Sequence, residues 1–303
     1  MDTFAYIVSP GTIENIKDIW PSVRLLPSFI IKTILKRNKP IKVGYIKGIK
    51  SLQGEEITGY IVLCPRLCAT DTDSQNLLID TLIFCEKLGV AVIGLDEHLS
   101  CVAEKIHDKI SKKIKVTVTD GNAFTAWSVL EALYRYVRIK DKEIKNLSFY
   151  INGRESVLGR LCEKKLSNYA GRPAESINEA DIAVNLAACL DKTADIIDKM
   201  KPGAILCELF SGNGIPREGI RNDIARIRSG LVKLPYPLDS KIRTRLPRAV
   251  IRTQLAETIL LTLAKKFFLN YLGNAINPDN LEEIADIAAR HGFEIWVPEA
   301  PLL

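Results

Sequence analysis

Two hydrophobic periods alternate along the N-terminal third of the chain. Short apolar or alternating runs are typical of strands, and runs with an apolar residue every three to four positions are typical of helices. The best hairpin pattern is KVGYIKGIKSLQGEEITGYIVLC at 42–64, where two alternating runs flank a turn around Gly54. The other runs predict strands at 4–9 and 90–95, a strand and turn at 115–124, and helices at 12–23, 74–89 and 125–139.

The pattern restarts at residue 147. Further strands are predicted at 147–152, 181–188 and 203–209, a long helix at about 249–272, and another helix near 279–290. Strands that alternate with helices and are themselves apolar predict an α/β protein, with a mainly parallel sheet in the second unit. The boundaries that this pattern favours divide the chain into residues 1–121, 122–245 and 246–303.

Composition narrows the class of protein. The chain has 303 residues, of which 47% are hydrophobic and 26% charged, with a formal net charge of +6, as expected for a soluble protein of about two domains. The densest basic stretches, 32–42 and 109–115, alternate with isoleucine and lack interleaved aromatic residues, so we expect solvated faces and no nucleic acid. No secretory signal and no apolar run of about 20 residues is visible, which predicts neither export nor a membrane span.

The seven cysteines lie scattered in apolar segments, which favours buried, reduced thiols in a cytoplasmic protein. Cys64, Cys68, Cys85 and Cys101, together with His98, could be metal ligands. Their spacing matches no usual zinc pattern, so we expect no metal site.

The stretch FYINGRESVLGRLCEKK at 149–165 carries the chemistry that decides most about function. Gly153, Ser156 and Gly159 follow an apolar run and open an amphipathic one. A dinucleotide-binding turn needs glycines for tight reversal, for approach of the pyrophosphate and for helix–strand contact, and a helix amino end binds phosphate through its N–H groups. Val157 opens the predicted helix, and Arg154 adds a cation beside the turn.

The adenosine half of such a site is expected to be shortened. A dinucleotide-binding unit normally continues into a second strand whose end reads the adenosine ribose, about twenty residues after the glycines. Here only 15 residues, LSNYAGRPAESINEA at 166–180, precede the strand at 181. Arg172 is the single candidate for contact with a 2′-phosphate.

Two resemblances to known families add to this pattern. GRESVLGR at 153–160, with EADIAVNLAA and MKPGAILCEL further on, resembles the nucleotide-binding turn and its continuation in methylenetetrahydrofolate dehydrogenase and shikimate dehydrogenase. This similarity covers about sixty residues. It implies that residues 122–245 form a shortened Rossmann-like domain that binds NAD or NADP.

The whole chain resembles the long-chain acyl-(acyl-carrier-protein) reductases, as a divergent member. The resemblance rests on five stretches in the right order: FAYIVSP, GYIVLCP, VIGLDEHLS, VTVTDGNAFTAW and RHGF. It implies a two-part α/β architecture with NADPH between the parts, and reduction of an acyl thioester to an aldehyde through a cysteine nucleophile. It also implies that residues 246–303 pack back on the cleft, and that the substrate arrives on an acyl carrier or as a small molecule.

Departures from that family favour an altered or lost activity. The position that matches the nucleophilic cysteine is Gln254, whose amide cannot form a thioester, and adjacent Thr253 has no evident base. Leu99 replaces a loop threonine, and Asp96 and Glu97 bring charge where the family has small residues.

The departures leave three hypotheses open. The chain is an oxidoreductase that transfers hydride directly to a carbonyl or imine, a non-catalytic protein that binds a nucleotide or acyl ligand, or a reductase that uses another cysteine, with Cys207 and Cys64 as the candidates near the cleft.

Several side chains have two interpretations each. Asn122 and Thr125 could orient a substrate at a helix mouth, or Asp120 or Asn122 could simply cap that helix. Glu257 could face the cleft or solvent. His291 is expected in C-terminal packing rather than catalysis. The amphipathic basic segment 25–39 suits a core helix with exposed lysines or, alternatively, contact with a membrane surface or an acidic acyl carrier.

Overall fold

The computed structural model describes residues 2–9, 11–37, 39–51, 54–65, 72–186, 191–209, 221–240, 246–267 and 271–297, and for 191–194 it describes the backbone alone. Its strands are β1 (Thr3–Val8), β2 (Ile41–Lys50), β3 (Glu56–Leu63), β4 (Val92–Leu95), β5 (Thr117–Thr119), β6 (Phe149–Asn152), β7 (Ile182–Asn185), β8 (Ile205–Leu209), β9 (Ala225–Ser229), β10 (Leu231–Lys233), β11 (Asp239–Ser240), β12 (Val250–Arg252) and β13 (Glu294–Ile295). Its α-helices are α1 (Ile13–Ile19), α2 (Ser28–Leu35), α3 (Thr72–Lys87), α4 (Glu97–Lys105), α5 (His107–Lys113), α6 (Asn122–Ile139), α7 (Val157–Tyr169), α8 (Asp191–Lys199), α9 (Thr253–Leu263) and α10 (Pro278–Arg290), with short 3₁₀ turns η1 (Pro21–Val23), η2 (Ile144–Asn146) and η3 (Gly273–Ala275).

The N-terminal half forms a six-stranded sheet in the order β11-β2-β3-β1-β4-β5. The strands β3, β1, β4 and β5 are parallel, whereas β2 and β3 form the antiparallel hairpin that the alternating pattern predicted. One face packs on α3, α4 and α5 and the other on α6 and α9, so the sheet is buried on both sides. That double burial explains why VAVIGL reads as a continuous apolar run.

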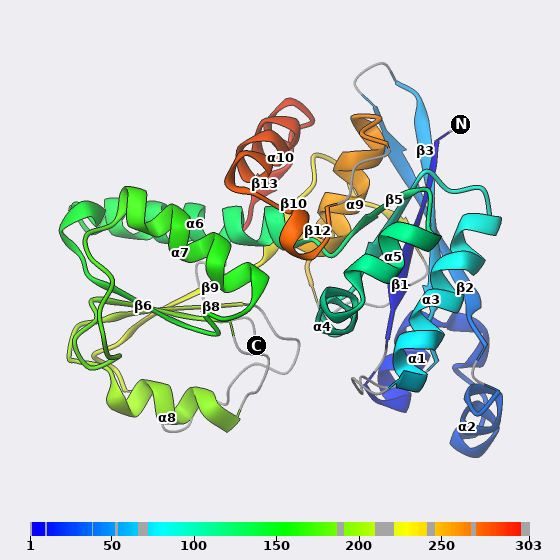
Figure 1. Cartoon of the computed structure of the whole chain (residues 1–303), viewed down its shortest axis with the longest axis horizontal. Helices are drawn as coiled ribbons and strands as arrows, with labels where there is room; N and C mark the ends of the chain where they lie inside the picture. The colour runs from blue at the N-terminus through cyan, green and yellow to red at the C-terminus, as the bar shows by residue number, and fades with distance from the viewer. Residues whose placement is uncertain are drawn as a thin grey trace.

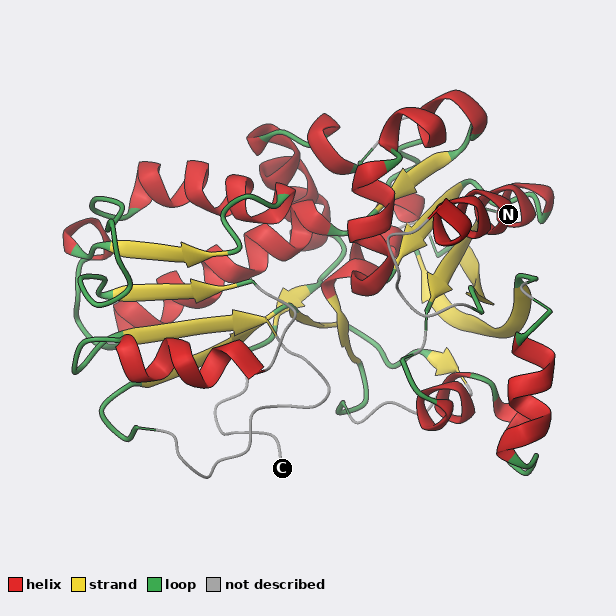
Figure 2. Ribbon diagram, turned by 60° about the horizontal axis from the view of Figure 1, so that its bottom comes forward, coloured by secondary structure: helices red, strands yellow, loops and turns green. Residues whose placement is uncertain are grey.

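The second sheet has the order β6-β7-β8-β9, and all of its strands are parallel, as predicted. Helices α6 and α7 cover one face and α8 the other (Figure 1). The arrows of this left-hand sheet point toward the centre of the molecule in Figure 2, so its carboxyl edge faces the N-terminal half. A small third sheet has the order β12-β10-β13. The fold is therefore α/β, with the two larger sheets arranged side by side.

The segment after residue 246 returns to the N-terminal sheet. Helix α9 packs on β1, β4 and α6, and α10 packs on α6. Close approach requires Gly94 in β4, because a Cβ there would lie 1.8 Å from Oγ1 of Thr258. The expected boundaries after residues 121 and 245 stay predictions. The first falls at the amino end of α6, which contacts both sheets.

The long helix expected over 249–272 is wrong in its extent. The first part of that range, Val250–Arg252, is strand β12 and pairs with β10, and α9 covers only Thr253–Leu263. Helices are confirmed at the other predicted positions, with α10 beginning at a capping box formed by Asn277 and Asn280. Within the described residues, no helix combines the length and apolarity needed to cross a membrane.

Helix α2 supports the core-packing interpretation of segment 25–39 only in part. Ile31 is fully buried in a small cluster with Ile16 and Val23, as a core-packing helix requires. Leu25 and Phe29, however, are 98% and 69% exposed on the same segment. The helix therefore packs through one side and leaves apolar and basic side chains free.

Candidate functional site

The turn between β6 and α7 has the backbone geometry of a phosphate-binding turn. Gly153 has a φ of +92°, which an L side chain rarely adopts, and Ser156 is the N-cap of α7, its hydroxyl accepting the N–H of Gly159 at 3.0 Å. A Cβ at Gly159 would lie 2.1 Å from the carbonyl oxygen of Gly153, so only glycine lets the helix approach the turn this closely. Each predicted member of the turn thus has a backbone reason for its identity.

This turn lies next to the point where the crossovers change sides of the sheet. Helix α7 follows β6 on one face and α8 follows β7 on the other. In open parallel sheets, ligands bind outside the carboxyl ends of the two strands that flank such a point. Those ends are Asn152 and Asn185, whose side chains are joined by a hydrogen bond of 2.8 Å from Nδ2 to Oδ1. The asparagines were missed from the sequence: Asn152 ends the strand predicted at 147–152, and Asn185 lies inside the strand predicted at 181–188.

Groups of this protein already contact the amino end of α7. The carboxylate of Glu104, on α4, lies close to the Val157 N–H and to Arg160. Burial raises the pKa of Glu104, while Arg160 and the Val157 N–H oppose that shift. Arg160 also donates to Oδ1 of Asn274 at 2.6 Å. An acidic side chain thus lies beside a donor that a phosphate would use.

A cavity of about 210 Å³ opens beside this contact. It is lined by Glu104, Lys105, His107, Val157, Arg160, Gly273 and Asn274. Arg154 lies on the same turn but pairs with Glu163 of α7 at 2.7 Å and is mostly exposed. The cavity therefore offers mixed charge around a helix amino end.

The predicted role of Arg172 is wrong in position. Its carbonyl oxygen accepts the N–H of Phe149, and Pro173 forms an isolated parallel bridge with Phe149. Phe149 is the first residue of β6, whereas the glycine turn follows the last residue of β6. Arg172 therefore lies beside the amino end of β6, away from the turn. The expected second strand is reduced to this single bridge, because the chain between α7 and β7 is too short to run alongside β6.

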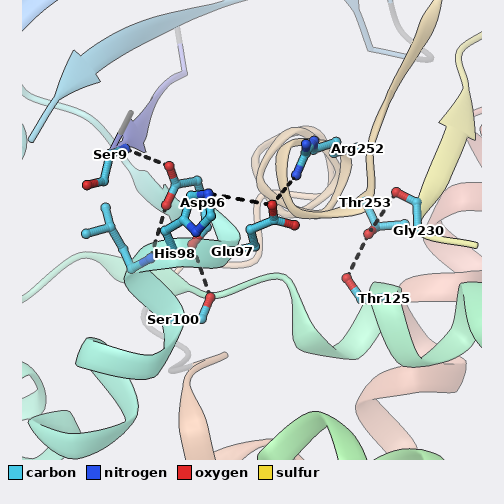
Figure 3. Close-up of polar contacts among 10 residues, drawn as sticks. Ser9, Asp96, Glu97, His98, Ser100, Thr125, Gly230, Arg252 and Thr253 are labelled. Carbon is cyan, nitrogen blue, oxygen red and sulfur yellow. Dashed lines mark hydrogen bonds and ion pairs between the residues drawn. The ribbon is translucent and has the colours of Figure 1, made fainter. Parts of the chain in front are cut away.

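Three helix amino ends converge at the carboxyl edge of the N-terminal sheet (Figure 3). Glu97 of α4 pairs with Arg252, which precedes α9, at 2.6 Å. Contacts that join α4, α6 and α9 here include Glu97–Arg252, Thr125–Thr253 at 2.7 Å between hydroxyls, and the Ser100 hydroxyl donating to the Asp120 carbonyl at 3.4 Å. The region that departs from the acyl reductase pattern is thus one connected polar cluster.

Asp96 caps α4 and belongs to the same cluster. Its carboxylate accepts the N–H of Leu99 at 3.1 Å and, from the end of β1, the N–H of Ser9 at 2.6 Å. Burial raises the pKa of Asp96 to about 6, against the opposing effect of these N–H donors. Burial, with Asp96 next in effect, also raises the pKa of nearby Tyr6 well above its ordinary value.

Asn122 and Gln254, two of the four catalytic candidates, both lie beside Gly121 and are nearly buried, and their catalytic role stays a prediction. Gln254 is 8% exposed. It packs directly against Gly121, since a Cβ on Gly121 would lie 2.5 Å from Cα of Gln254. Asn122 opens α6 and is also 8% exposed; its N–H is capped by Oδ1 of Asp120 at 3.0 Å. The capping alternative therefore holds for Asp120 and not for Asn122.

Thr125 and Glu257 are buried inside the protein, so neither faces a substrate. The Thr125 hydroxyl bonds to the Gly121 carbonyl and to Thr253. Glu257 is fully buried; its carboxylate accepts the N–H of Phe124 at 2.7 Å and the Thr119 hydroxyl. Both the cleft-facing and the solvent-facing interpretation of Glu257 are wrong. It holds the amino end of α6 against α9.

Cys85, Cys101, Cys162 and Cys207 are not activated as nucleophiles, and Cys64 is buried. Burial raises the pKa of Cys207 and of Cys85 to about 12, and raises that of Cys162 further. Cys101 is exposed, and its pKa is raised as well, mainly by partial burial. Cys68 lies outside the described residues. Among those that are described, no three His, Cys, Asp or Glu side chains come together as metal ligands.

His291 forms the C-cap of α10, where its N–H donates to the carbonyl of Ile287. Partial burial and neighbouring Arg290 lower its pKa. Its position agrees with the C-terminal packing role expected for it.

No protein-family model matches the chain, and the comparison with curated protein sequences finds no match. Among solved structures the chain is similar to a malic enzyme from Pyrococcus horikoshii Ot3, at 14% identity and a TM-score of 0.43, over 96% of this chain and 77% of that one. It is also similar to the bifunctional enzyme FolD, methylenetetrahydrofolate dehydrogenase/cyclohydrolase, from Campylobacter jejuni, at 13% and 0.35, over 95% and 88%. A third is the NAD-dependent malic enzyme from Thermotoga maritima, at 12% and 0.41, over 94% and 83%. Membership of the acyl-(acyl-carrier-protein) reductases stays a prediction.

Proposed function

We propose that this protein is a nicotinamide-dinucleotide-dependent oxidoreductase that acts on a carbonyl or imine without a covalent cysteine step. The observation that carries the proposal is the β6–α7 turn, where Gly153, Ser156 and Gly159 have the conformation that a pyrophosphate needs. Its position beside the crossover point, at the ends of β6 and β7, adds support because dinucleotides bind there in open parallel sheets.

The turn fits the phosphates, but the chain does not fit the whole dinucleotide equally well. Gly153, Ser156, Val157 and Gly159 would hold the pyrophosphate, and bound nicotinamide would supply or accept a hydride. The adenosine half has no second strand, and Arg172 lies beside the amino end of β6, away from the turn. We therefore propose either NADP or NAD as the cofactor, with the adenosine end held loosely.

Helix α4 links the turn to the polar cluster of the N-terminal sheet. Its cap, Asp96, and Glu104 near its carboxyl end are eight residues apart, or about 12 Å along the helix. A carboxyl whose pKa is about 6 holds or releases a proton near neutral pH. Asp96 is thus the group we propose as proton donor to the reacting oxygen or nitrogen, and Arg252 as the cation that orients an acidic substrate.

A relation to the acyl-(acyl-carrier-protein) reductases remains part of the proposal, with changed chemistry. Gln254 at the nucleophile position and raised pKa values at Cys85, Cys162 and Cys207 argue against an acyl-enzyme. The exposed apolar and basic side chains of segment 25–39 would suit an acidic acyl carrier or a membrane surface as a partner. A cytoplasmic location is likewise proposed, because the described residues Cys85, Cys101, Cys162 and Cys207 form no disulfide.

One observation favours a second candidate, a non-catalytic protein that keeps the fold but binds a different ligand. The carboxylate of Glu104 lies close to the Val157 N–H, and it would repel a pyrophosphate at close range. If Glu104 cannot move aside, the turn has lost its cofactor.

Calorimetric titration with NADPH and NADH separates the two candidates. The oxidoreductase proposal expects binding at micromolar concentration that is lost in Gly153→Trp, because the indole fills the phosphate place and an L residue resists the φ of +92°. Gly11→Trp is the matched control, since nothing lies within 4 Å of a Cβ at Gly11. Absence of binding by the wild-type protein up to millimolar concentrations would reject the oxidoreductase and favour the non-catalytic candidate.

A further inference from the structure

Two arginines of β9 share one carboxylate on β8. Nε and Nη2 of Arg226 lie 2.7 and 2.5 Å from Oε1 of Glu208, and Nε of Arg228 lies 3.5 Å from that same oxygen. The side chains of Arg226, Arg228 and Glu208 are 15%, 13% and 10% exposed, respectively. Two guanidinium groups and one carboxylate leave one positive charge in excess in a nearly buried place.

Within the part of the chain that the structure describes, the excess charge is poorly satisfied. Arg228 makes no hydrogen bond to Glu208 at 3.5 Å, and Nη2 of Arg226 is buried in a geometry that meets no hydrogen-bond criterion despite its ion pair. A guanidinium offers five N–H donors, and burying them without acceptors is costly. An anionic group that accepted these donors would offset that cost.

The cluster retains limited contact with solvent, because its three side chains are 10–15% exposed. Glu208 and Arg228 are register partners near the carboxyl ends of β8 and β9, on the α8 face of the sheet. The apolar side chains of α8 cover Ala183 and Leu206, and Leu206 lies on the same face as Glu208, two residues nearer the amino end of β8. Asn185 ends the adjacent strand, so the arginines continue the polar edge that begins at the Asn152–Asn185 pair.

We propose that Arg226 and Arg228 form a binding site for an anionic ligand group, a phosphate or a carboxylate, at the carboxyl edge of β8 and β9. Glu208 positions both guanidinium groups and weakens the site by partly neutralising them. Arginine pairs hold such oxyanions through parallel N–H···O bonds, which a lysine cannot reproduce. The site is separate from the β6–α7 turn, and the inference does not depend on a bound dinucleotide.

The test measures binding of inorganic phosphate and of malonate by calorimetry to four proteins: wild type, Arg228→Gln, Glu208→Gln and Lys199→Gln. Lys199 is the matched control, because it is an exposed cation of α8 near the opposite edge of the sheet. Arg228→Gln is expected to weaken binding about tenfold or more, the usual worth of a charge-assisted hydrogen bond. Glu208→Gln is expected to tighten binding, and Lys199→Gln to change it less than twofold.

Opposite effects of Arg228→Gln and Glu208→Gln are the signature of the site, since a purely structural triad would lose affinity in both. Preference for phosphate or for malonate identifies the ligand class, and either preference with these dependences supports the site. Equal affinity of Arg228→Gln and Lys199→Gln would overturn it. Phosphate binding that is abolished by Gly153→Trp but not by Arg228→Gln would also overturn it, because the anion would then lie at the α7 turn. If Arg228→Gln does not fold, tightening in Glu208→Gln supports the site and weakening there rejects it.

Discussion

The carboxylate of Glu257, on α9, accepts the N–H of Phe124 at the amino end of α6 at 2.7 Å. This bond joins α9, in the segment after residue 246, to α6, the helix that contacts both larger sheets. It fixes the place where α4, α6 and α9 converge, and with it the position of Gln254.

The burial of Glu257 makes stability depend on pH in a defined direction. Burial raises the pKa of Glu257 from 4.5 to about 8, partly offset by the Thr119 and Phe124 donors. The folded protein keeps a proton that the unfolded chain releases above about pH 4.5, so this contribution is complete below 4.5 and is lost as the pH rises toward 8. Its slope is at most about 1.4 kcal/mol per pH unit. Urea unfolding at pH 5, 6.5 and 8 should show a smaller decline for Glu257→Gln than for wild type.

Asp96 and Asp120 have pKa values raised by burial to about 6 and about 7, so they add declines of the same sign that remain in the variant. Glu294→Gln is the control, because Glu294 is exposed on β13. Identical pH profiles for wild type and Glu257→Gln would show that Glu257 does not titrate in this way.

Gly159→Ala should destabilise the protein even though alanine normally favours a helix interior by about 1 kcal/mol. The new Cβ would lie 2.1 Å from the carbonyl oxygen of Gly153 and 2.7 Å from Cα of Arg154, and these backbone atoms cannot rotate away. A loss of about 1–3 kcal/mol in the free energy of unfolding is expected from such overpacking. Gly11→Ala, in open space, should change it by no more than about 0.5 kcal/mol. Equal stability of the two variants would mean that α7 does not approach the turn this closely.

Alkylation tests the absence of a reactive thiol. Brief treatment of the native protein with iodoacetamide at pH 7.5 should modify Cys101 slowly and leave Cys64, Cys85, Cys162 and Cys207 intact, since these four are buried. Unfolding in urea before treatment should expose all of them. Peptide mass spectrometry gives the modified fraction of each. Rapid modification of Cys207 in the folded protein would revive the thioester chemistry that we reject.

The sequence predicted local features better than long-range ones. The β2–β3 hairpin and the parallel second sheet follow from neighbouring residues, and both are present. Residues 250–252 form a strand only because β10 lies beside them, and no local pattern contains that partner. Glu257 has the spacing of an ordinary helix surface residue, but α6 covers it.

The missed and misplaced site residues have the same cause. Arg172 seemed suitable because it follows the glycines at the right interval, yet the short connection anchors it beside Phe149. Glu104 is 53 positions before Val157, and nothing in either segment indicates the contact. Asn152 and Asn185 could have been found, because each is the polar residue that ends an apolar strand of a parallel sheet.

The most direct test of the account is the NADPH affinity of Glu104→Gln relative to wild type. The central claim is that the amino end of α7 is the phosphate place and that the Glu104 carboxylate competes for it. Removing the charge while keeping the shape should tighten NADPH binding by about tenfold or more, whereas Glu155→Gln, which removes an exposed acid from the same turn, should change it far less. Equal, undetectable binding in wild type and Glu104→Gln up to millimolar NADPH would contradict the claim.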